Sequence, residues 1–105
     1  MKSVELSPHA RRELFSILAH LMDVAGARTA DAYDIAFKDV VARLGHFSGT
    51  GTPRPDLGPE TRVTSVDSYL TFYDGGPKSE TVHVLRILHG HHNITAEMIA
   101  RGREP

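Results

Sequence analysis

The last quarter of the chain contains the segment that constrains the fold most. Residues 81–94 read T-V-H-V-L-R-I-L-H-G-H-H-N-I. The Val, Leu and Ile residues fall on both sides of an extended chain, which is typical of a central strand covered on both faces. Arg86 interrupts this run, and His89, His91 and His92 follow it directly. A charge in a covered strand costs free energy unless it is paired or used, so we expect function to concentrate in this segment.

The first half of the chain predicts a short strand and two helices. Residues 2–6 alternate in polarity and favour a strand. Ser7-Pro8 suits a helix start, because Ser can cap and Pro fits the first turn. Gly26 ends this helix, and a second helix runs from about Arg28 to Gly45, so the two form an antiparallel hairpin. Their apolar stripes are Leu14, Ile17, Leu18 and Leu21, then Tyr33, Phe37, Val40, Val41 and Leu44.

The second half predicts a loop and then three strands. Residues 48–60 are rich in Gly and Pro and form the loop. Three segments of strand composition follow, separated by turn residues, which indicates an antiparallel meander. These strands cover residues 62–66, 69–73 and 81–88.

A short tail follows the last strand. Thr95 can cap a helical turn that reaches about Ala100, and residues 102–105 should fray. The order of strand, two helices and three strands indicates one α+β domain over residues 1–105, with the helical hairpin packed on one face of a small sheet. The first strand either joins an edge of this sheet or runs beside the last strand.

Composition narrows the class of protein. The chain has 105 residues, 13 acidic and 12 basic side chains and no Cys, which excludes disulfides and thiolate zinc sites and fits a reducing cytoplasm. No segment has the form of a signal peptide or the length of a membrane span, so we expect no membrane partner. The near-zero net charge argues against binding to bulk nucleic acid, and we expect no specific DNA binding by this chain alone.

Three segments carry a resemblance to a known family. V-L-R-I-L-H-G, residues 84–90, resembles the C-terminal strand of the ParE toxins, within the RelE/ParE superfamily of bacterial toxin–antitoxin modules. V-E-L-S-P-H-A, residues 4–10, is similar to that family's first strand and helix start. G-T-P-R-P-D-L-G, residues 51–58, with the strand 69–73, is similar to its loop and hairpin. The three occur in the family's order, and the resemblance covers nearly the whole chain.

The resemblance implies the toxin of a type II toxin–antitoxin pair, which acts by binding and poisoning DNA gyrase. Such a toxin needs no catalytic residue and no cofactor, and a ParD-like antitoxin neutralises it in a hetero-oligomeric complex. In the family, the antitoxin wraps the helical hairpin and the sheet. The first helix has more apolar positions than one buried face needs, although the 48–60 loop could equally cover Phe15. We expect the antitoxin at Leu14, Phe15, Leu18 and Met22.

The candidate target-binding residues are Arg side chains of the loop and sheet and the His residues after the last strand. Arg binds carboxylates and phosphates in fixed geometry. One hypothesis is therefore that these arginines form a basic patch on the open sheet face that binds an acidic partner or phosphates. The alternative is that Arg86 pairs with an internal carboxylate, such as Asp67 or Glu80, while Arg62 only covers the sheet. The full set is Arg54, Arg62, Arg86, His89, His91 and His92.

The clustered histidines and the tyrosines allow other interpretations. Imidazoles can bind zinc or nickel, but Gly90 interrupts the strand and a third ligand in fixed geometry is missing, so no metal site is predicted. The histidines could also do acid–base chemistry, or lie in a solvated turn. Tyr69 and Tyr73 share one strand face with Thr71, and we expect both rings to pack with their hydroxyls in water.

A ribosome-dependent mRNA endoribonuclease of the RelE type is the alternative function. In that branch a Tyr, His or Glu activates the ribose 2′-hydroxyl, and basic groups stabilise the transition state. The chain has no Tyr after the last strand, no Lys in residues 48–66 and no net positive charge, which favours gyrase binding. However, His91 and His92 stand where ParE-type chains often carry Arg. The catalytic candidates for a nuclease are Arg62, Arg86, His89, His91 and His92.

Overall fold

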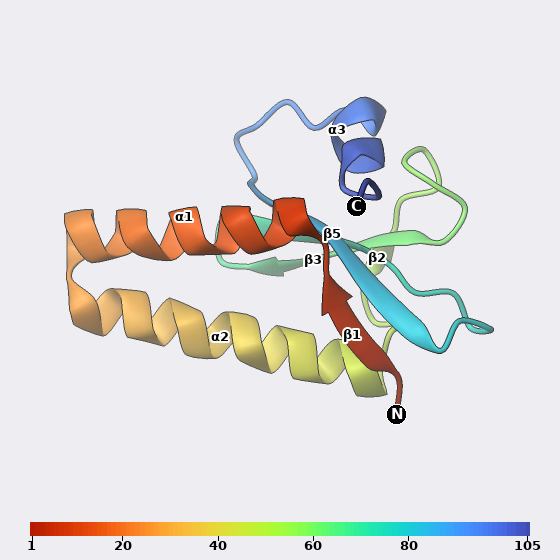
Figure 1. Cartoon of the computed structure of the whole chain (residues 1–105), viewed down its shortest axis with the longest axis horizontal. Helices are drawn as coiled ribbons and strands as arrows, with labels where there is room; N and C mark the ends of the chain where they lie inside the picture. The colour runs from red at the N-terminus through yellow and green to blue at the C-terminus, as the bar shows by residue number, and fades with distance from the viewer.

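The computed structural model describes all 105 residues and contains three helices and five strands. In chain order these are β1 (Ser3–Leu6), α1 (Pro8–Ala25), α2 (Ala27–His46), β2 (Thr52–Pro53), β3 (Thr61–Val66), β4 (Tyr69–Asp74), β5 (Thr81–His89) and α3 (Ala96–Arg101). The strands form one sheet in the order β1-β5-β4-β3-β2, in which β1 runs parallel to β5 and the other neighbours are antiparallel (Figure 1). The predicted α+β fold is confirmed, with the first strand beside the last.

Local signals start and turn the helical hairpin. The Ser7 hydroxyl accepts a hydrogen bond from the Ala10 N–H at 3.0 Å, which satisfies a free donor at the start of α1. The same hydroxyl donates to the Leu85 carbonyl oxygen at 2.7 Å and ties the helix to β5. Gly26 joins α1 to α2 with a φ of 90°, a conformation that side chains disfavour. The predicted helix start and joint are therefore confirmed.

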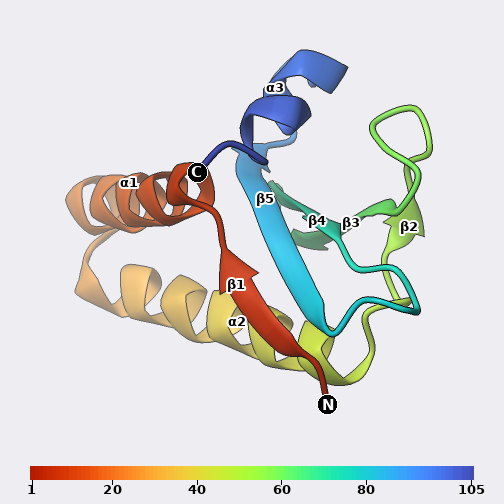
Figure 2. The ribbon, with the colours of Figure 1, turned by 45° about the vertical axis from the view of Figure 1, so that its right-hand side comes forward.

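The hairpin lies on one face of the sheet and buries the larger core (Figure 2). The end of the hairpin at the α1–α2 joint extends beyond the sheet (Figure 1). The half nearer the sheet packs on β1, β3, β4 and β5, so this face is closed by two long helices. The buried members of the core are Ala10, Phe37, Val40, Leu44, Val66, Tyr73, Val82, Val84 and Ile87.

α2 continues through Gly45 to His46, one residue past the predicted end. Gly45 is buried, and a Cβ at this position would lie 2.9 Å from the Lys2 carbonyl oxygen. The Lys2 N–H also donates to the Gly45 carbonyl oxygen at 2.8 Å. The Gly therefore allows the helix to approach the N-terminal strand closely, and it does not end the helix.

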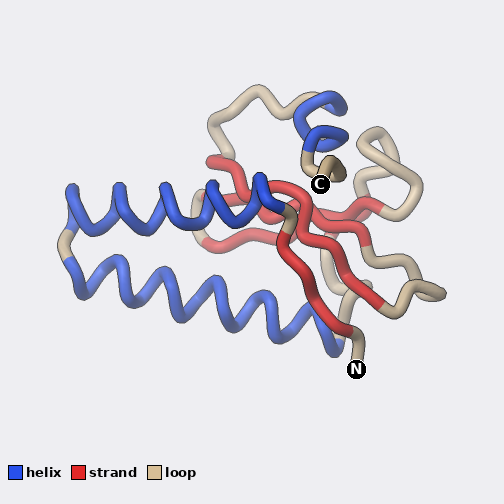
Figure 3. Tube along the Cα trace, viewed as in Figure 1, coloured by secondary structure: helices blue, strands red, loops and turns tan.

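α3 and the loop before β3 cover the opposite face of the sheet (Figure 3). The predicted cap of α3 is confirmed, since the Thr95 hydroxyl accepts a hydrogen bond from the Met98 N–H at 3.2 Å. This second core is smaller than the first. Its buried members are Leu57, Phe72, Leu85, Leu88 and Ile99.

The expected fraying of residues 102–105 is wrong for the first two of them. Gly102 is buried, because the lack of a side chain lets the chain lie directly on Leu85. The Arg103 guanidinium donates to the Asp74 carboxylate and to the Thr61 hydroxyl, both at 2.8 Å. The tail is thus fixed to β3, β4 and β5 by contacts that are far apart in sequence.

β5 contains an irregularity that changes which side chains share a face. Val84 pairs with Tyr73, but Arg86 pairs with the preceding residue of β4, Phe72, so one extra residue is inserted in β5. Ile87 consequently joins Val84 in the core under the hairpin. Strict alternation predicts that Val84 and Arg86 share a face, and the bulge makes this prediction wrong.

Candidate functional site

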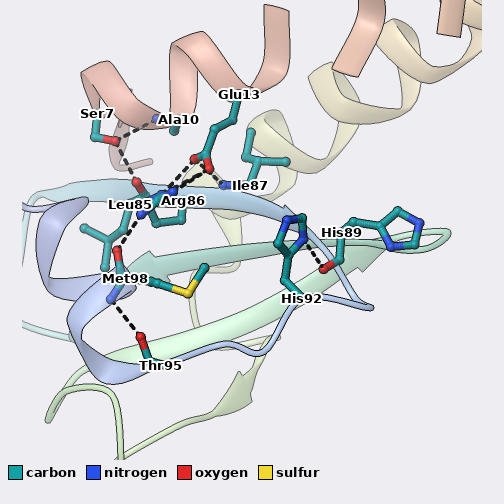
Figure 4. A network of polar contacts seen from close by, with 10 residues as sticks. All are labelled: Ser7, Ala10, Glu13, Leu85, Arg86, Ile87, His89, His92, Thr95 and Met98. Atoms are coloured by element: carbon teal, nitrogen blue, oxygen red, sulfur yellow. Dashed lines mark hydrogen bonds and ion pairs between the residues drawn. The ribbon is translucent and has the colours of Figure 1, made fainter. Parts of the chain in front are cut away.

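Arg86 lies at the centre of a polar network between α1, β5 and α3 (Figure 4). Its Nε donates to the two Glu13 carboxylate oxygens at 3.0 and 3.1 Å, and its Nη2 donates to Glu13 Oε2 at 2.8 Å. Its Nη1 donates to the Met98 carbonyl oxygen at 2.8 Å. Glu13 Oε1 also accepts the Ile87 N–H at 3.1 Å. One guanidinium therefore links both layers that cover the sheet.

The Arg86–Glu13 pair is largely shielded from water, with side-chain exposures of 14% and 19%. The bidentate geometry and the extra hydrogen bonds offset the cost of taking two charges out of water. Internal pairing of Arg86 was one of the two alternatives, but the partner is neither Asp67 nor Glu80. Glu13 is 73 residues away in sequence, so no local pattern identifies it as the partner.

His89 is the last residue of β5 and is half-buried, and His91 and His92 lie on the exposed turn that follows it. The His91 N–H donates to His89 Nδ1 at 3.2 Å, and the two rings stack with centroids 4.6 Å apart. His92 Nδ1 lies 3.1 Å from the His89 carbonyl oxygen. Because a carbonyl only accepts, this contact is a hydrogen bond when the His92 nitrogen carries the ring proton. The turn thus has a defined shape although it is solvated.

A groove of about 520 Å³ runs between α1, the end of β5 and α3. It brings the Arg86–Glu13 pair into one space with two of the clustered histidines. Tyr69 also lines it and packs edge-on against the His89 ring at 5.2 Å, so the expected packing of this Tyr is confirmed. Sequence reasoning missed His20, which reaches the groove because it lies seven residues, two helical turns, after Glu13.

The structure does not bring Arg54, Arg62 and Arg86 into one patch. Arg54 forms a bidentate pair with Asp56 in the loop, at 3.0 and 3.1 Å, which lowers the pKa of the Asp56 carboxyl. Arg62 Nη1 donates to two loop carbonyl oxygens, at 2.7 and 3.1 Å. Arg62 is the cross-strand partner of Tyr73, and Arg86 is the cross-strand partner of Phe72. Because Phe72 and Tyr73 are consecutive in β4 and point to opposite faces of the sheet, the two arginines do so as well.

An apolar surface on the outside of α1 is left uncovered. Phe15 is 76% exposed, so the 48–60 loop does not cover it, and Met22 is 49% exposed. With Ala19 they recur at helical spacing, and we call these three residues the α1 stripe. Of the other two expected contacts, Leu14 packs partly into the core, and Leu18 is half-buried.

Two other tyrosines have raised pKa values and serve the fold. The Tyr73 ring is buried, and burial raises the pKa of its phenol. Its hydroxyl donates to the Ser48 carbonyl oxygen at 2.7 Å and accepts the Gly51 N–H at 2.9 Å. The prediction that this hydroxyl lies in water is therefore wrong. The Asp67 carboxylate beside Tyr33 raises the pKa of that phenol. Both phenols therefore stay protonated at neutral pH.

No three His, Asp or Glu side chains are grouped closely enough to hold a metal ion. None of the helices combines the length and the apolar composition that crossing a membrane requires.

Comparisons with known proteins place these features in context. The family model described as the ParE toxin of the type II toxin–antitoxin system parDE matches residues 4–94, a span that ends just before α3. A chain of the chromosomal ParDE toxin–antitoxin system from P. aeruginosa has a similar fold, with a TM-score of 0.61 and 21% identity over 85% of this chain and 96% of that chain. No curated protein matches the sequence.

Proposed function

The chain belongs to the family of ParE toxins of type II toxin–antitoxin systems, and on that premise we propose that it binds and poisons DNA gyrase and is neutralised by a cognate antitoxin. Both partners would meet the toxin in the cytoplasm, and neither interaction needs a cofactor. The two interactions would use different surfaces, which can be considered in turn.

The α1 stripe supports the antitoxin half of the proposal. Phe15 and Met22 are large apolar side chains that the fold leaves in water, at a spacing that a partner helix can match. An apolar helix face of this kind is typical of helix-in-groove docking. Leu14 and Leu18 lie beside the stripe and would line the edge of the contact, so the antitoxin would cover all four expected residues.

The observation that carries the target half is the contrast between Arg86 and the histidine turn. Arg86 has its hydrogen bonds inside the fold, whereas His91 and His92 lie on a shaped turn that no element covers, next to the half-buried His89. A poison that acts by binding needs exposed groups held in place, and this turn meets the requirement. The target contact would centre on the turn, and Arg54 and Arg62 at the far edge of the sheet would be peripheral to it.

The test is inhibition of gyrase supercoiling by purified, antitoxin-free protein. We expect inhibition with accumulation of cleaved DNA, reversed when antitoxin is added. A double variant, His91→Ala with His92→Ala, should lose most of the inhibition and still bind antitoxin. The matched control changes two exposed histidines elsewhere, His46→Ala with His83→Ala, and should inhibit like the wild type. Equal inhibition by all three proteins would exclude the turn from the target contact.

One observation favours the endoribonuclease alternative. The groove beside α1 gathers Tyr69, His20, His89 and His92 around the Arg86–Glu13 pair, and these are side chains that general acid–base catalysis uses. In this alternative Arg86 would have to leave Glu13 to reach a phosphate. Cleavage of mRNA in a translation reaction with purified ribosomes, by protein that leaves supercoiling unchanged, would replace the gyrase proposal with this one.

A further inference from the structure

The C-terminal segment, residues 94–105, differs from the rest of the chain in how it is attached. The match to the family model ends at residue 94, so α3 lies outside the matched span. Figure 2 shows α3 as the only helix on its side of the sheet, joined to β5 by a loop. Residues 90–93 of that loop are exposed.

The surface under this segment is apolar. Ile99 is fully buried, and it packs against Phe72, Leu85 and Leu88 of the sheet. Met98 and Ile94 pack at the edge of the same cluster. Without the segment, this face of the sheet would present large aliphatic and aromatic side chains to water, the kind of patch that marks an interaction site in soluble proteins.

The segment is held by one apolar cluster and by hydrogen bonds of two arginines, without any strand pairing. α3 has only six residues, and so short a helix is not stable in water without packing. Its polar anchors are the Arg86 Nη1 bond to the Met98 carbonyl oxygen and the bonds of Arg103 to Asp74 and Thr61. Opening the segment therefore breaks a small number of interactions and leaves the Arg86–Glu13 pair intact.

We propose that residues 94–105 form a strap that closes the second sheet face, and that the toxin engages its target with the strap open. The occupant of the opened face would be an amphipathic helix of the target, with an aliphatic side chain in the place of Ile99. A carboxylate or carbonyl oxygen of that helix would take the Arg86 Nη1 bond that Met98 now holds. Opening of the strap would thus make the shielded Arg86 accessible to the target. This inference rests on the proposed function.

Gly102 provides a way to open the strap without straining the backbone. Its φ of −64° and ψ of −16° suit any residue. A Cβ at this position, however, would meet the Leu85 carbonyl oxygen and would lie 2.9 Å from the Leu85 Cβ. Gly102→Ala should therefore lift the strap from β5. Gly49→Ala is the matched control, because a Cβ at Gly49 meets nothing within 4 Å.

The experiment combines hydrogen exchange and gyrase inhibition on the full chain. In the wild type, amides of residues 95–105 should exchange through an opening that costs less than global unfolding, and so faster than those of β4 and β5. In Gly102→Ala, exchange in this segment should be at least about tenfold faster, and half-inhibition should need roughly threefold less toxin, because more molecules are binding-competent.

Gly49→Ala should match the wild type in both measurements, and circular dichroism should show all three proteins folded. Arg103→Ala is a milder second opening variant with the same expected direction.

The outcomes separate this inference from the proposed function. If the amides of residues 95–105 exchange as slowly as those of β5 in the wild type, the proposal of an opening strap is wrong. It is also wrong if Gly102→Ala leaves the exchange rates of these amides unchanged. A released strap with unchanged or weaker inhibition would overturn the gating role and leave gyrase as the target. If no variant inhibits gyrase, the proposed function fails, and the exchange data still decide whether the strap opens on its own.

Discussion

The two faces of the sheet are closed in different ways. On one face, α1 and α2, of 18 and 20 residues, cover a core of nine buried residues. On the other face, a helix of six residues and a loop cover a core of five. Large cores bury enough apolar area to offset the entropy of ordering the chain, and small ones do so only marginally. We infer that the hairpin face is a permanent part of the fold, whereas the α3 face can open.

Arg86 is the point at which the two faces meet. It belongs to β5, its carboxylate partner Glu13 comes from α1, and its second partner Met98 comes from α3. Only the contact with Met98 depends on the segment that can open. We call the Arg86–Glu13 pair the link between the faces. Variants of the hairpin face, the link, the α3 face and the α1 stripe should lower the free energy of unfolding by decreasing amounts, and the following four predictions rank them.

The largest loss should come from the hairpin face. Phe37→Ala removes a ring that is 2% exposed and should lower the free energy of unfolding by about 3–5 kcal/mol, as buried Phe truncations do. Phe47→Ala is the matched control, because Phe47 is 62% exposed and its loss should cost less than about 0.5 kcal/mol. Urea unfolding followed by circular dichroism measures both. A loss at Phe37 no larger than that at Phe47 would contradict a fixed hairpin face.

The link should rank second. Glu13→Ala leaves the Arg86 charge shielded and without a counter-ion, and should cost about 2–4 kcal/mol. Glu97→Ala removes an exposed partner of Arg101 on α3 and should cost less than about 0.5 kcal/mol. Adding Arg86→Met to Glu13→Ala should recover most of the loss, because no charge is then left unpaired. No recovery in the double variant would show that the cost comes from packing of Glu13 and not from the charge.

The α3 face should rank third. Ile99 is fully buried, yet Ile99→Ala should cost only about 1–2 kcal/mol globally, below the roughly 2–5 kcal/mol usual for such a truncation. The reason is that opening of the strap limits the penalty: a weakened strap detaches while the rest of the fold stays intact. Urea unfolding gives the global value, and hydrogen exchange should show faster exchange confined to residues 95–105. A global loss equal to that of Phe37→Ala would mean that both faces are equally fixed.

The smallest effect on folding should come from the α1 stripe, which neither core uses. Phe15→Asp should change the free energy of unfolding by less than about 0.5 kcal/mol and weaken antitoxin binding by about 10- to 100-fold. Ile35→Asp on α2 is the control, because Ile35 is 60% exposed and lies outside the stripe. Calorimetric titration with antitoxin measures the affinities after circular dichroism has established folding. Equal affinity of both variants would place the antitoxin elsewhere.

Sequence by itself determined the elements of this fold, because their signals are local, with the exception of the two-residue strand β2, which lies in the segment predicted to be a loop. The cap at Ser7, the joint at Gly26 and the cap at Thr95 each involve atoms within a few residues, and all three are present in the structure. The apolar stripes predicted which face of each helix is buried. The order of elements then left few arrangements of the sheet, and the parallel pairing of β1 with β5 was one of the two expected.

Only the tertiary structure decided how the ionisable residues of the site are used. The bulge in β5, the pairing of Arg86 with Glu13 and the anchoring of Arg103 on Asp74 each depend on strand register or on contacts between distant segments. Arg86 and His91 are five residues apart and looked equivalent in the sequence, yet one is held inside the fold and the other is on an exposed turn. Residue type and spacing fix what a side chain can do, and long-range packing fixes whether it is free to do it.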